Sequence, residues 1–182
     1  MMKRIFIRRL FTRLLMLVIV TGAIALGFVT LPAHAALRQL EEAPGQTVYQ
    51  SRQTLQDQHS NSWQAIAFKR IQPNGAATIY LRLVGFPGTV ELDHTRPLGL
   101  TNSLGKTWTA ADVSQQMFTD ATHSESNIGQ YDLQPILMQL EPTVPLQLDL
   151  PTLNGTETRL NIPSALIEEW RSMLLTLSSP QN

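Results

Sequence analysis

The sequence predicts an α+β domain, in which an antiparallel sheet of about six or seven short strands packs one face against a C-terminal helix. Three observations support this fold class. Short runs of β-branched, aromatic and aliphatic residues alternate with turn residues. A strong hairpin pattern lies between residues 63 and 86, and an amphipathic helical pattern follows Pro163. A small β-barrel closed by the helix is the alternative arrangement of the same elements.

The central hairpin consists of two apolar runs, residues 63–71 and 76–86, with Pro73, Asn74 and Gly75 between them. A two-residue turn would pair Pro73 with the first residue of the second run and would need a backbone N–H that proline lacks. We therefore predict a three-residue loop in which Gly75 takes the left-handed conformation that glycine adopts without strain.

This register divides the hairpin into two unequal faces, because side chains alternate along a strand. The first face is apolar except for Lys69 and should meet the core. Its residues are Trp63, Ala65, Ala67, Ile71, Ala77, Ile79, Leu81 and Leu83. The second face mixes aromatic and aliphatic side chains with arginine. Its candidate binding residues are Phe68, Arg70, Tyr80, Arg82 and Phe86.

The second face has three interpretations. It could hold an apolar ligand that carries a carboxylate, or it could receive a partner protein, since aromatic residues and arginine are enriched at interfaces. Alternatively, the helix after Pro163 covers it through Trp170 and Leu174. We expect the helix to lie there, because an apolar helix stripe and a sheet face both need covering.

Further elements follow from local patterns. Residues 47–56 predict the first strand, and residues 144–150 and 156–162 predict a hairpin closed by an Asn-Gly turn. A capping-box pattern predicts a short helix over residues 109–118.

Residues 1–35 are predicted to be a signal peptide. A basic start is followed by an apolar run over residues 14–31 and by an A-x-A cleavage motif at residues 33–35. An uncleaved anchor helix is the alternative, because 18 residues can span a hydrocarbon core. Under both interpretations residues 36–182 form a single exported domain.

Charge and cysteine content restrict the partners and the chemistry. The predicted signal peptide contains five of the 14 basic residues and none of the 14 acidic ones, so the remainder has a net charge of −5. Without a lysine or arginine run, nucleic acid and anionic lipid are not expected as partners, and membrane contact is expected only through an uncleaved first segment. The absence of cysteine excludes disulfides, iron–sulfur clusters and thiol chemistry.

The sequence contains no G-x-S-x-G, H-E-x-x-H or Walker-type loop, and we assign no catalytic residue. His59, His94 and His123 lack the spacing of metal ligands, and no metal or other cofactor is expected.

The densest polar cluster, Asp93, His94 and Arg96, is a second candidate site because functional residues often lie on loops. The alternative is turn chemistry with a local ion pair. A hydrolase built on this loop would need a distant nucleophile such as Ser114 or Ser124.

Several stretches after residue 36 resemble those of a known family. They are residues 37–46, 81–88 and 131–133, together with Trp108, Asp112, Ile162, Pro163, Glu169 and Trp170. In these stretches the chain resembles an uncharacterised family of exported cyanobacterial proteins, the domain of unknown function 3122. The resemblance implies the periplasm or the thylakoid lumen as destination and implies no activity.

We therefore expect a non-catalytic accessory or binding protein of the periplasm or thylakoid lumen that contacts a protein or a membrane complex. A carrier for a small apolar ligand, such as a lipid or a pigment, is the alternative. The hydrolase is a third hypothesis.

Overall fold

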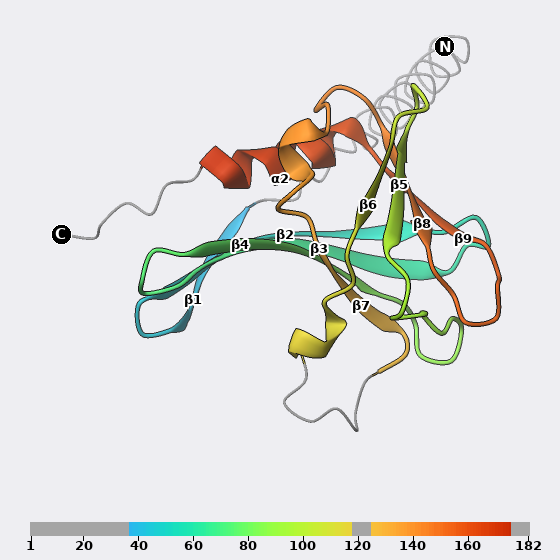
Figure 1. Ribbon diagram of the computed structural model, residues 1–182, viewed down its shortest axis with the longest axis horizontal. Coiled ribbons are helices and arrows are strands. Elements are labelled where there is room, and N and C mark those ends of the chain that lie inside the picture. Colours follow the sequence, from blue (N-terminus) through green and yellow to red (C-terminus); the bar gives the residue numbers. More distant parts are fainter. Residues whose placement is uncertain (1–36, 118–124, 176–182) are drawn as a thin grey trace, which may run out of the picture. The chain divides into compact units, whose positions relative to one another are not determined.

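The computed structural model describes residues 37–117 and 125–175 (Figure 1). The predicted signal peptide, His123 and Ser124 lie outside the described residues. Within these two ranges, no helix is both long enough and apolar enough to cross a membrane.

The described residues form nine strands in two antiparallel sheets, followed by one α-helix. The five-stranded sheet has the order β1-β2-β3-β4-β7 and contains Arg38–Ala43, Gln46–Gln56, Ser62–Ile71, Ala77–Val84 and Ile128–Asp132. The four-stranded sheet has the order β6-β5-β8-β9 and contains Thr107–Ala110, Leu98–Asn102, Leu146–Leu150 and Thr158–Ile162. The remaining elements are the 3-10 turns η1 (Ser114–Met117) and η3 (Leu137–Gln139) and the helix α2 (Ser164–Leu175).

The two sheets approach each other at two seams without closing into a barrel. An isolated bridge joins Asp57, after β2, to Leu160 in β9, and another joins Asp112, after β6, to Tyr131 in β7. No continuous ladder spans either seam among the described strands. The prediction of an α+β domain with an antiparallel sheet and a C-terminal helix is therefore confirmed, and the barrel alternative is not.

The predicted three-residue hairpin loop is confirmed. Gln72 and Ala76 close the hairpin around it, and the Gln72 N–H donates to the Ala76 carbonyl oxygen at 2.9 Å. The Gly75 N–H donates to the Gln72 carbonyl oxygen at 2.9 Å, and Gly75 has a φ of 81°. Ile71 then pairs with Ala77, so the two faces of the hairpin have the predicted composition.

The prediction that the C-terminal helix covers the second face is wrong. Trp170 and Leu174 of α2 belong to the same core cluster as Trp63 and Leu83 of the first face. Figure 1 shows α2 and the four-stranded sheet on the same side of the five-stranded sheet. The connection explains this placement. Pro163 is the only residue between β9 and α2, so the helix must begin on the side where β9 already lies.

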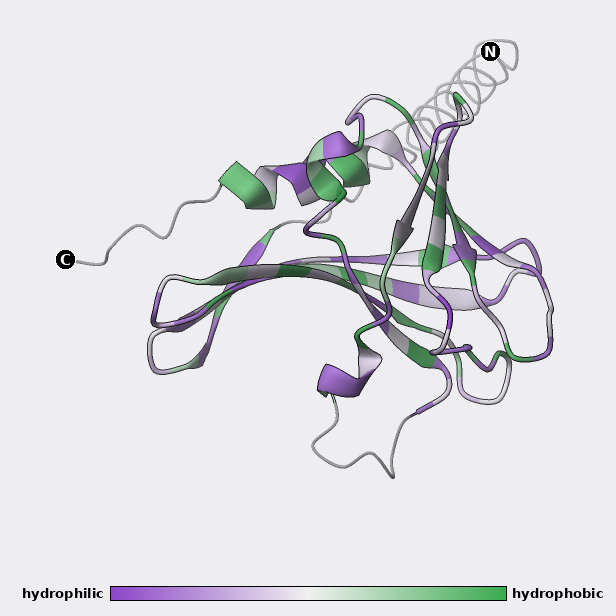
Figure 2. Ribbon diagram, in the orientation of Figure 1, coloured by the Kyte–Doolittle hydropathy of each residue, from purple (hydrophilic) through white to green (hydrophobic). Residues whose placement is uncertain are grey.

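The core lies between the two sheets and α2. Hydrophobic residues alternate with polar residues along the strands of both sheets (Figure 2). The largest side chains that are less than 2% exposed include Trp63, Trp170 and Tyr131. The tryptophans come from β3 and from α2, so this helix is part of the core rather than an addition to its surface.

Lys69, the charged exception on the core face, lies at the end of α2. It is only 8% exposed, and its Nζ donates to the carbonyl oxygen of Leu174 at 3.3 Å. A cation at the carboxyl end of a helix is favourable because it complements the helix dipole. Burial lowers the pKa of Lys69 from its ordinary value. The exception in the apolar pattern thus stabilises the helix end that crosses this face.

A buried carboxylate organises the turn between β2 and β3. Asp57 is 7% exposed and accepts hydrogen bonds from the backbone N–H groups of His59 at 2.8 Å and Asn61 at 2.9 Å. The Asn61 side chain and the Trp63 indole N–H donate at 3.0 and 3.1 Å. Burial raises the pKa of Asp57, but these hydrogen bonds outweigh it and hold the pKa below its ordinary value.

The predicted helix over residues 109–118 is wrong in the part that the structure describes. Residues Thr107–Ala110 form β6, and only the 3-10 turn Ser114–Met117 follows. Asp112 accepts the N–H of Ser114 at 2.8 Å, which is a local turn two residues long rather than a helix cap. The two apolar residues with helical spacing, Val113 and Met117, are too few to stabilise a short helix. The strands at 47–56, 144–150 and 156–162 and the helix after Pro163 are confirmed within a few residues.

Candidate functional site

The second face of the hairpin continues across the five-stranded sheet and is not covered by α2. We call it the outer face. The register places Val48 opposite Arg70, Phe68 opposite Tyr80, and Arg82 opposite Ile66. The outer face of β2, β3 and β4 therefore carries Val48, Gln50, Arg52, Gln64, Ile66, Phe68, Arg70, Thr78, Tyr80, Arg82 and Val84.

The centre of the outer face is apolar and buried. Val48, Ile66 and Phe68 are 5–7% exposed, and Tyr80 and Val84 pack against them. The rings of Phe68 and Tyr80 lie with their centroids 5.7 Å apart. This small cluster is separate from the main core.

Two arginine side chains cover the phenyl ring of Phe68. The guanidinium carbon of Arg82 lies 5.2 Å from the ring centroid and that of Arg70 lies 5.6 Å from it. A guanidinium over an aromatic face is attracted by the ring quadrupole, and its stem shields the ring from water. Phe68 is therefore the point around which both arginines are arranged.

Each arginine also has a polar partner that fixes its position. Arg70 donates to both carboxylate oxygens of Glu42 in β1, with Nε to Oε2 at 2.9 Å and Nη2 to Oε1 at 3.3 Å. Arg82 donates through Nε at 3.2 Å and Nη2 at 2.8 Å to Oε1 of Gln130, a buried residue of β7. Arg52 donates to Oε1 of Gln64 at 3.5 Å.

The pKa of Arg82 is lowered from its ordinary value. Burial is the main cause, and the charges of Arg70 and Arg52 lower it further, while Glu42 raises it. Like charges therefore lie close enough to repel one another at this face.

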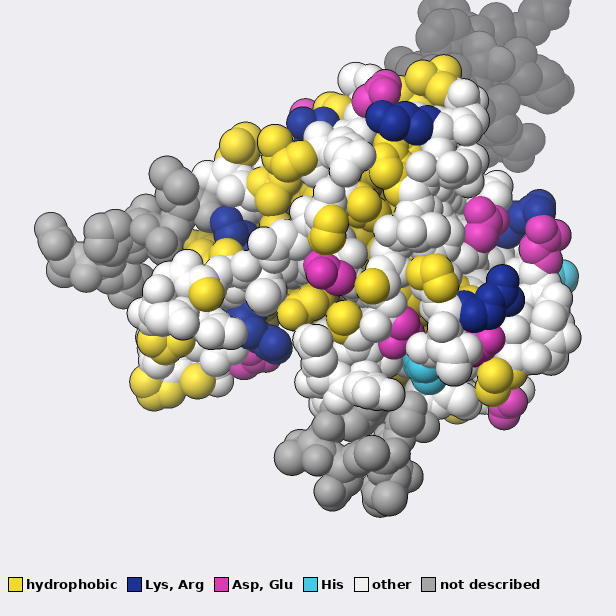
Figure 3. Space-filling model, in the orientation of Figure 1, with side chains coloured by type: hydrophobic (Ala, Val, Ile, Leu, Met, Phe, Trp, Pro, Cys, Tyr) yellow, Lys and Arg dark blue, Asp and Glu magenta, His cyan; other side chains and the backbone are white. Residues whose placement is uncertain are grey.

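A shallow hollow of about 280 Å³ lies among these side chains. It is lined by Leu40, Glu41, Glu42, Val48, Gln50, Arg52, Ile66, Phe68, Arg70 and Arg82. Its floor is apolar and its rim is charged. Figure 3 shows that, on the face visible there, acidic and basic side chains are interspersed, without a field of one sign.

Four of the five predicted binding residues lie together on the outer face, and the fifth does not. Phe86 lies beyond β4, is 68% exposed and is not among the residues that line the hollow. The strand ends at Val84, and a Cβ atom on the next residue, Gly85, would lie 2.9 Å from the Trp63 ring. The chain leaves the sheet at this close approach, so Phe86 does not lie on the outer face.

Sequence reasoning missed Arg52, Glu42 and Gln130. Arg52 follows the same two-residue alternation as Val48 in its strand, and this signal could have placed it on a face. Glu42 and Gln130 belong to the strands β1 and β7, whose positions in the sheet no local pattern reveals.

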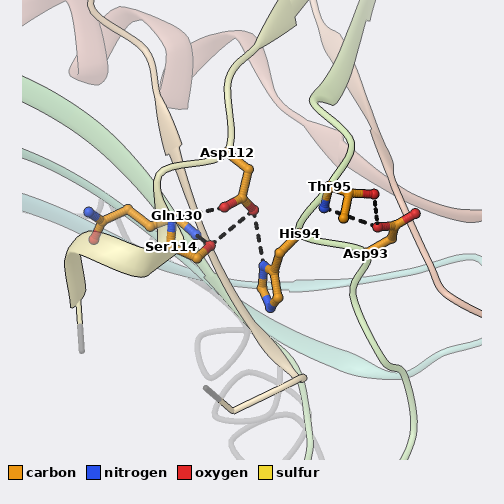
Figure 4. Close-up of polar contacts among 6 residues, drawn as sticks. All are labelled: Asp93, His94, Thr95, Asp112, Ser114 and Gln130. Carbon is orange, nitrogen blue, oxygen red and sulfur yellow. Dashed lines mark hydrogen bonds and ion pairs between the residues drawn. The ribbon is translucent and has the colours of Figure 1, made fainter. Parts of the chain in front are cut away.

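The predicted polar cluster does not converge on one site (Figure 4). Asp93 accepts the backbone N–H of Thr95 at 3.0 Å and also its hydroxyl, and these bonds lower the pKa of Asp93. His94 turns the other way, with Nδ1 3.1 Å from Oδ2 of Asp112. Arg96 lines a separate polar hollow of about 660 Å³ beside β5 and β8.

Ser114, a nucleophile considered for a hydrolase, contacts the carboxylate rather than the histidine. Its hydroxyl donates to Oδ2 of Asp112 at 3.0 Å and accepts the backbone N–H of Gln130 at 2.9 Å (Figure 4). Asp112 thus lies between Ser114 and His94. Nucleophilic catalysis by serine needs the base to contact the hydroxyl, and the carboxylate to orient the base. This arrangement instead ties the segment after β6 to β7 and to the loop at His94.

Tyr131 lies beside this network with its hydroxyl fully buried. Among the described residues the hydroxyl has no hydrogen-bond partner. Burial raises the pKa of Tyr131 above the range in which tyrosine ordinarily titrates, and the charges of Asp112 and Asp93 add to the shift. Gly129 makes the space, since a Cβ atom there would lie 2.7 Å from the hydroxyl oxygen.

We expect Tyr131→Phe to leave the free energy of unfolding unchanged or to raise it by up to about 1 kcal/mol, because a buried hydroxyl without a partner is unfavourable. Gly129→Ala should lower it by about 1–3 kcal/mol through overpacking. The loss should be smaller when Gly129→Ala is combined with Tyr131→Phe. Urea denaturation of the three variants measures this, and additive losses would contradict the assigned contact.

In the two described ranges, no three His, Cys, Asp or Glu side chains are grouped so that they could hold a metal ion.

Comparison with known proteins gives a family and no activity. The model of the family described as protein of unknown function (DUF3122) matches residues 35–173, so the chain belongs to this family. No curated protein and no solved structure matches the chain.

Proposed function

We propose that this DUF3122 protein is a non-catalytic binding protein whose outer face docks another protein. The observation that carries the proposal is the composition of a sheet face that α2 leaves uncovered. A buried aromatic and aliphatic centre is surrounded there by arginine side chains. Aromatic residues and arginine are enriched at protein interfaces, and tryptophan, tyrosine and arginine are enriched among the residues that carry most of the binding energy.

The geometry favours a protein over a small apolar ligand. Small-molecule sites are usually concave pockets of about 300–1,000 Å³. The hollow on the outer face, at about 280 Å³, suits one anchoring side chain better than a whole lipid or pigment. A carrier would also need space between the sheet and the helix. Neither the hollow on the outer face nor the polar hollow beside β5 and β8 is lined by a residue of α2.

The proposed location is the periplasm or the thylakoid lumen of a cyanobacterium. Residues 1–35 have the pattern of an export signal, and the family resemblance supports that destination. The partner is therefore sought among exported or membrane-bound proteins of the same compartment.

Capture from periplasmic and thylakoid fractions tests this proposal. Immobilised wild-type protein is compared with Arg52→Glu on the outer face and with Arg159→Glu on the second sheet. Both arginines are exposed, which makes Arg159 a matched control. We expect specific proteins that the wild type and Arg159→Glu retain and Arg52→Glu loses. Retention of the same proteins by all three would contradict the proposal, and so would retention of none.

A further inference from the structure

We propose that the outer face receives an acidic segment of the partner, with one carboxylate of that segment binding Arg82 and Arg52 beside an apolar anchor in the hollow. This inference rests on the proposed function and names the chemistry of the partner at the same site.

The arginines of the outer face are oriented by neutral groups as well as by acid. Arg82 is held by the amide oxygen of Gln130, and Arg52 by that of Gln64. An amide oxygen fixes the direction of a guanidinium without neutralising its charge. Two of the three guanidiniums at the hollow are therefore positioned by neutral groups and have no ion pair among the described residues.

The net charge at the centre of the outer face follows from all the charged groups that lie there. The hollow is lined by three arginines and by Glu41 and Glu42, and only Glu42 pairs with one of these arginines among the described residues. Arg38 lies opposite Gln50 and Asp132 opposite Tyr80 in the same sheet. These two residues add one charge of each sign at the edges. The centre of the face remains positive although the domain as a whole is acidic.

Among the three arginines, Arg82 should contribute most to the binding of an anion. It is partly buried, and its charged form is already disfavoured by burial and by the neighbouring Arg70 and Arg52, which lower its pKa. An incoming carboxylate would offset both effects. Charge-assisted hydrogen bonds between arginine and carboxylate are about twice as strong as neutral ones.

Glu42 shows what the site accepts. Its carboxylate makes a two-point contact with Arg70 at the rim of the hollow, and its own side chain is 49% exposed. Glu42 thus forms an ion pair with Arg70 within the same chain. A partner carboxylate that approaches the same face is repelled by Glu42, so this residue should weaken binding.

The occupant is better described as a peptide segment than as an anionic membrane surface. A net charge of −5 outside the first 35 residues opposes approach to an anionic bilayer. The apolar floor of Val48, Ile66 and Phe68 lies below the charged rim, where a protruding side chain can reach and a flat surface cannot. An extended segment that alternates acidic and apolar residues fits this arrangement.

Fluorescence anisotropy with labelled hexapeptides tests the inference. The probes alternate leucine with glutamate, with glutamine or with lysine, and the protein is the full domain after residue 35. We expect the glutamate peptide to bind about tenfold or more tightly than the glutamine peptide, with the lysine peptide weaker still. Arg82→Gln and Arg52→Gln should each weaken the glutamate peptide several-fold, whereas Glu42→Gln should tighten it. Arg159→Gln serves as the control and should have no effect.

Other outcomes overturn the inference in distinguishable ways. Equal binding of the glutamate and glutamine peptides would mean that the face docks apolar chemistry only, and the proposed function would stand. Arg82-dependent binding to phosphatidylglycerol vesicles but not to the peptide would assign the face to a lipid surface. Binding of neither would reject the acidic segment, while the capture experiment with Arg52→Glu decides the proposed function independently.

Discussion

Replacing Trp170 with alanine is expected to lower the free energy of unfolding by about 3–5 kcal/mol. The side chain is 0% exposed and belongs to the core cluster that both sheets share with α2. Its removal takes away the largest apolar contact of the helix and leaves a cavity that the rigid strands cannot fill.

Urea denaturation at 25 °C measures this loss. Leu175→Ala in the same helix is the matched control, because Leu175 is 79% exposed and its replacement should change the stability by less than about 0.5 kcal/mol. A loss below about 1 kcal/mol for Trp170→Ala would show that α2 is not anchored on the core face. In that case α2 would be free to cover the outer face instead.

The second large effect is expected at the buried carboxylate after β2. Asp57→Ala should lower the free energy of unfolding by about 3 kcal/mol, because it leaves several donors, among them the Trp63 indole, without their acceptor. Asp93→Ala is the matched control. Asp93 also accepts bonds within its own turn, from Thr95, but these contacts are exposed, so its replacement should cost much less stability than that of Asp57. Similar losses for the two variants would contradict this account.

The same carboxylate should make the fold sensitive to acid. The pKa of Asp57 in the folded state lies below its ordinary value, so its stabilising contribution is complete above the unfolded-state pKa near 4. That contribution should decline as the pH falls from there through the folded-state pKa. Asp57→Asn should therefore show a flatter dependence of stability on pH below about 5 than the wild type. Equal slopes for the two proteins would assign the acid sensitivity to other groups.

Local rules predicted the parts of the fold that depend on a few neighbouring residues. Proline cannot donate a hydrogen bond, and this fixed the loop at Pro73 and hence the two faces of the hairpin. The same rules identified the helix after Pro163. Local rules could not predict which face of the hairpin the helix covers. The answer depends on the position of β9 in a second sheet, and no local sequence pattern predicts that sheet. The helix expected over residues 109–118 is wrong for two reasons. The carboxylate of Asp112 bonds within its own turn, and the backbone of Asp112 forms a β-bridge with Tyr131 of β7.

The candidate site was likewise predicted only where it depends on neighbouring residues. Alternation along one hairpin is enough to place Phe68, Arg70, Tyr80 and Arg82 on one face. The groups that hold these arginines, Glu42 and Gln130, come from strands distant in sequence. The arginine cluster likewise does not appear as a basic run in the sequence, because Arg52, Arg70 and Arg82 lie on three different strands. The acidic composition of the whole domain therefore hides a positive centre on one face.

Site-specific photo-crosslinking tests most directly whether the outer face is the docking surface. A benzophenone amino acid is introduced in place of Gln50, which lines the hollow, or in place of Gln147 on the outer side of the second sheet. Both glutamines are partly exposed, so the two positions are matched. We predict that irradiation in the native compartment gives a defined adduct with a second protein from position 50 only, and that Arg82→Gln abolishes it. Adducts from position 147 alone, or equal adducts from both positions, would contradict the assignment of the outer face.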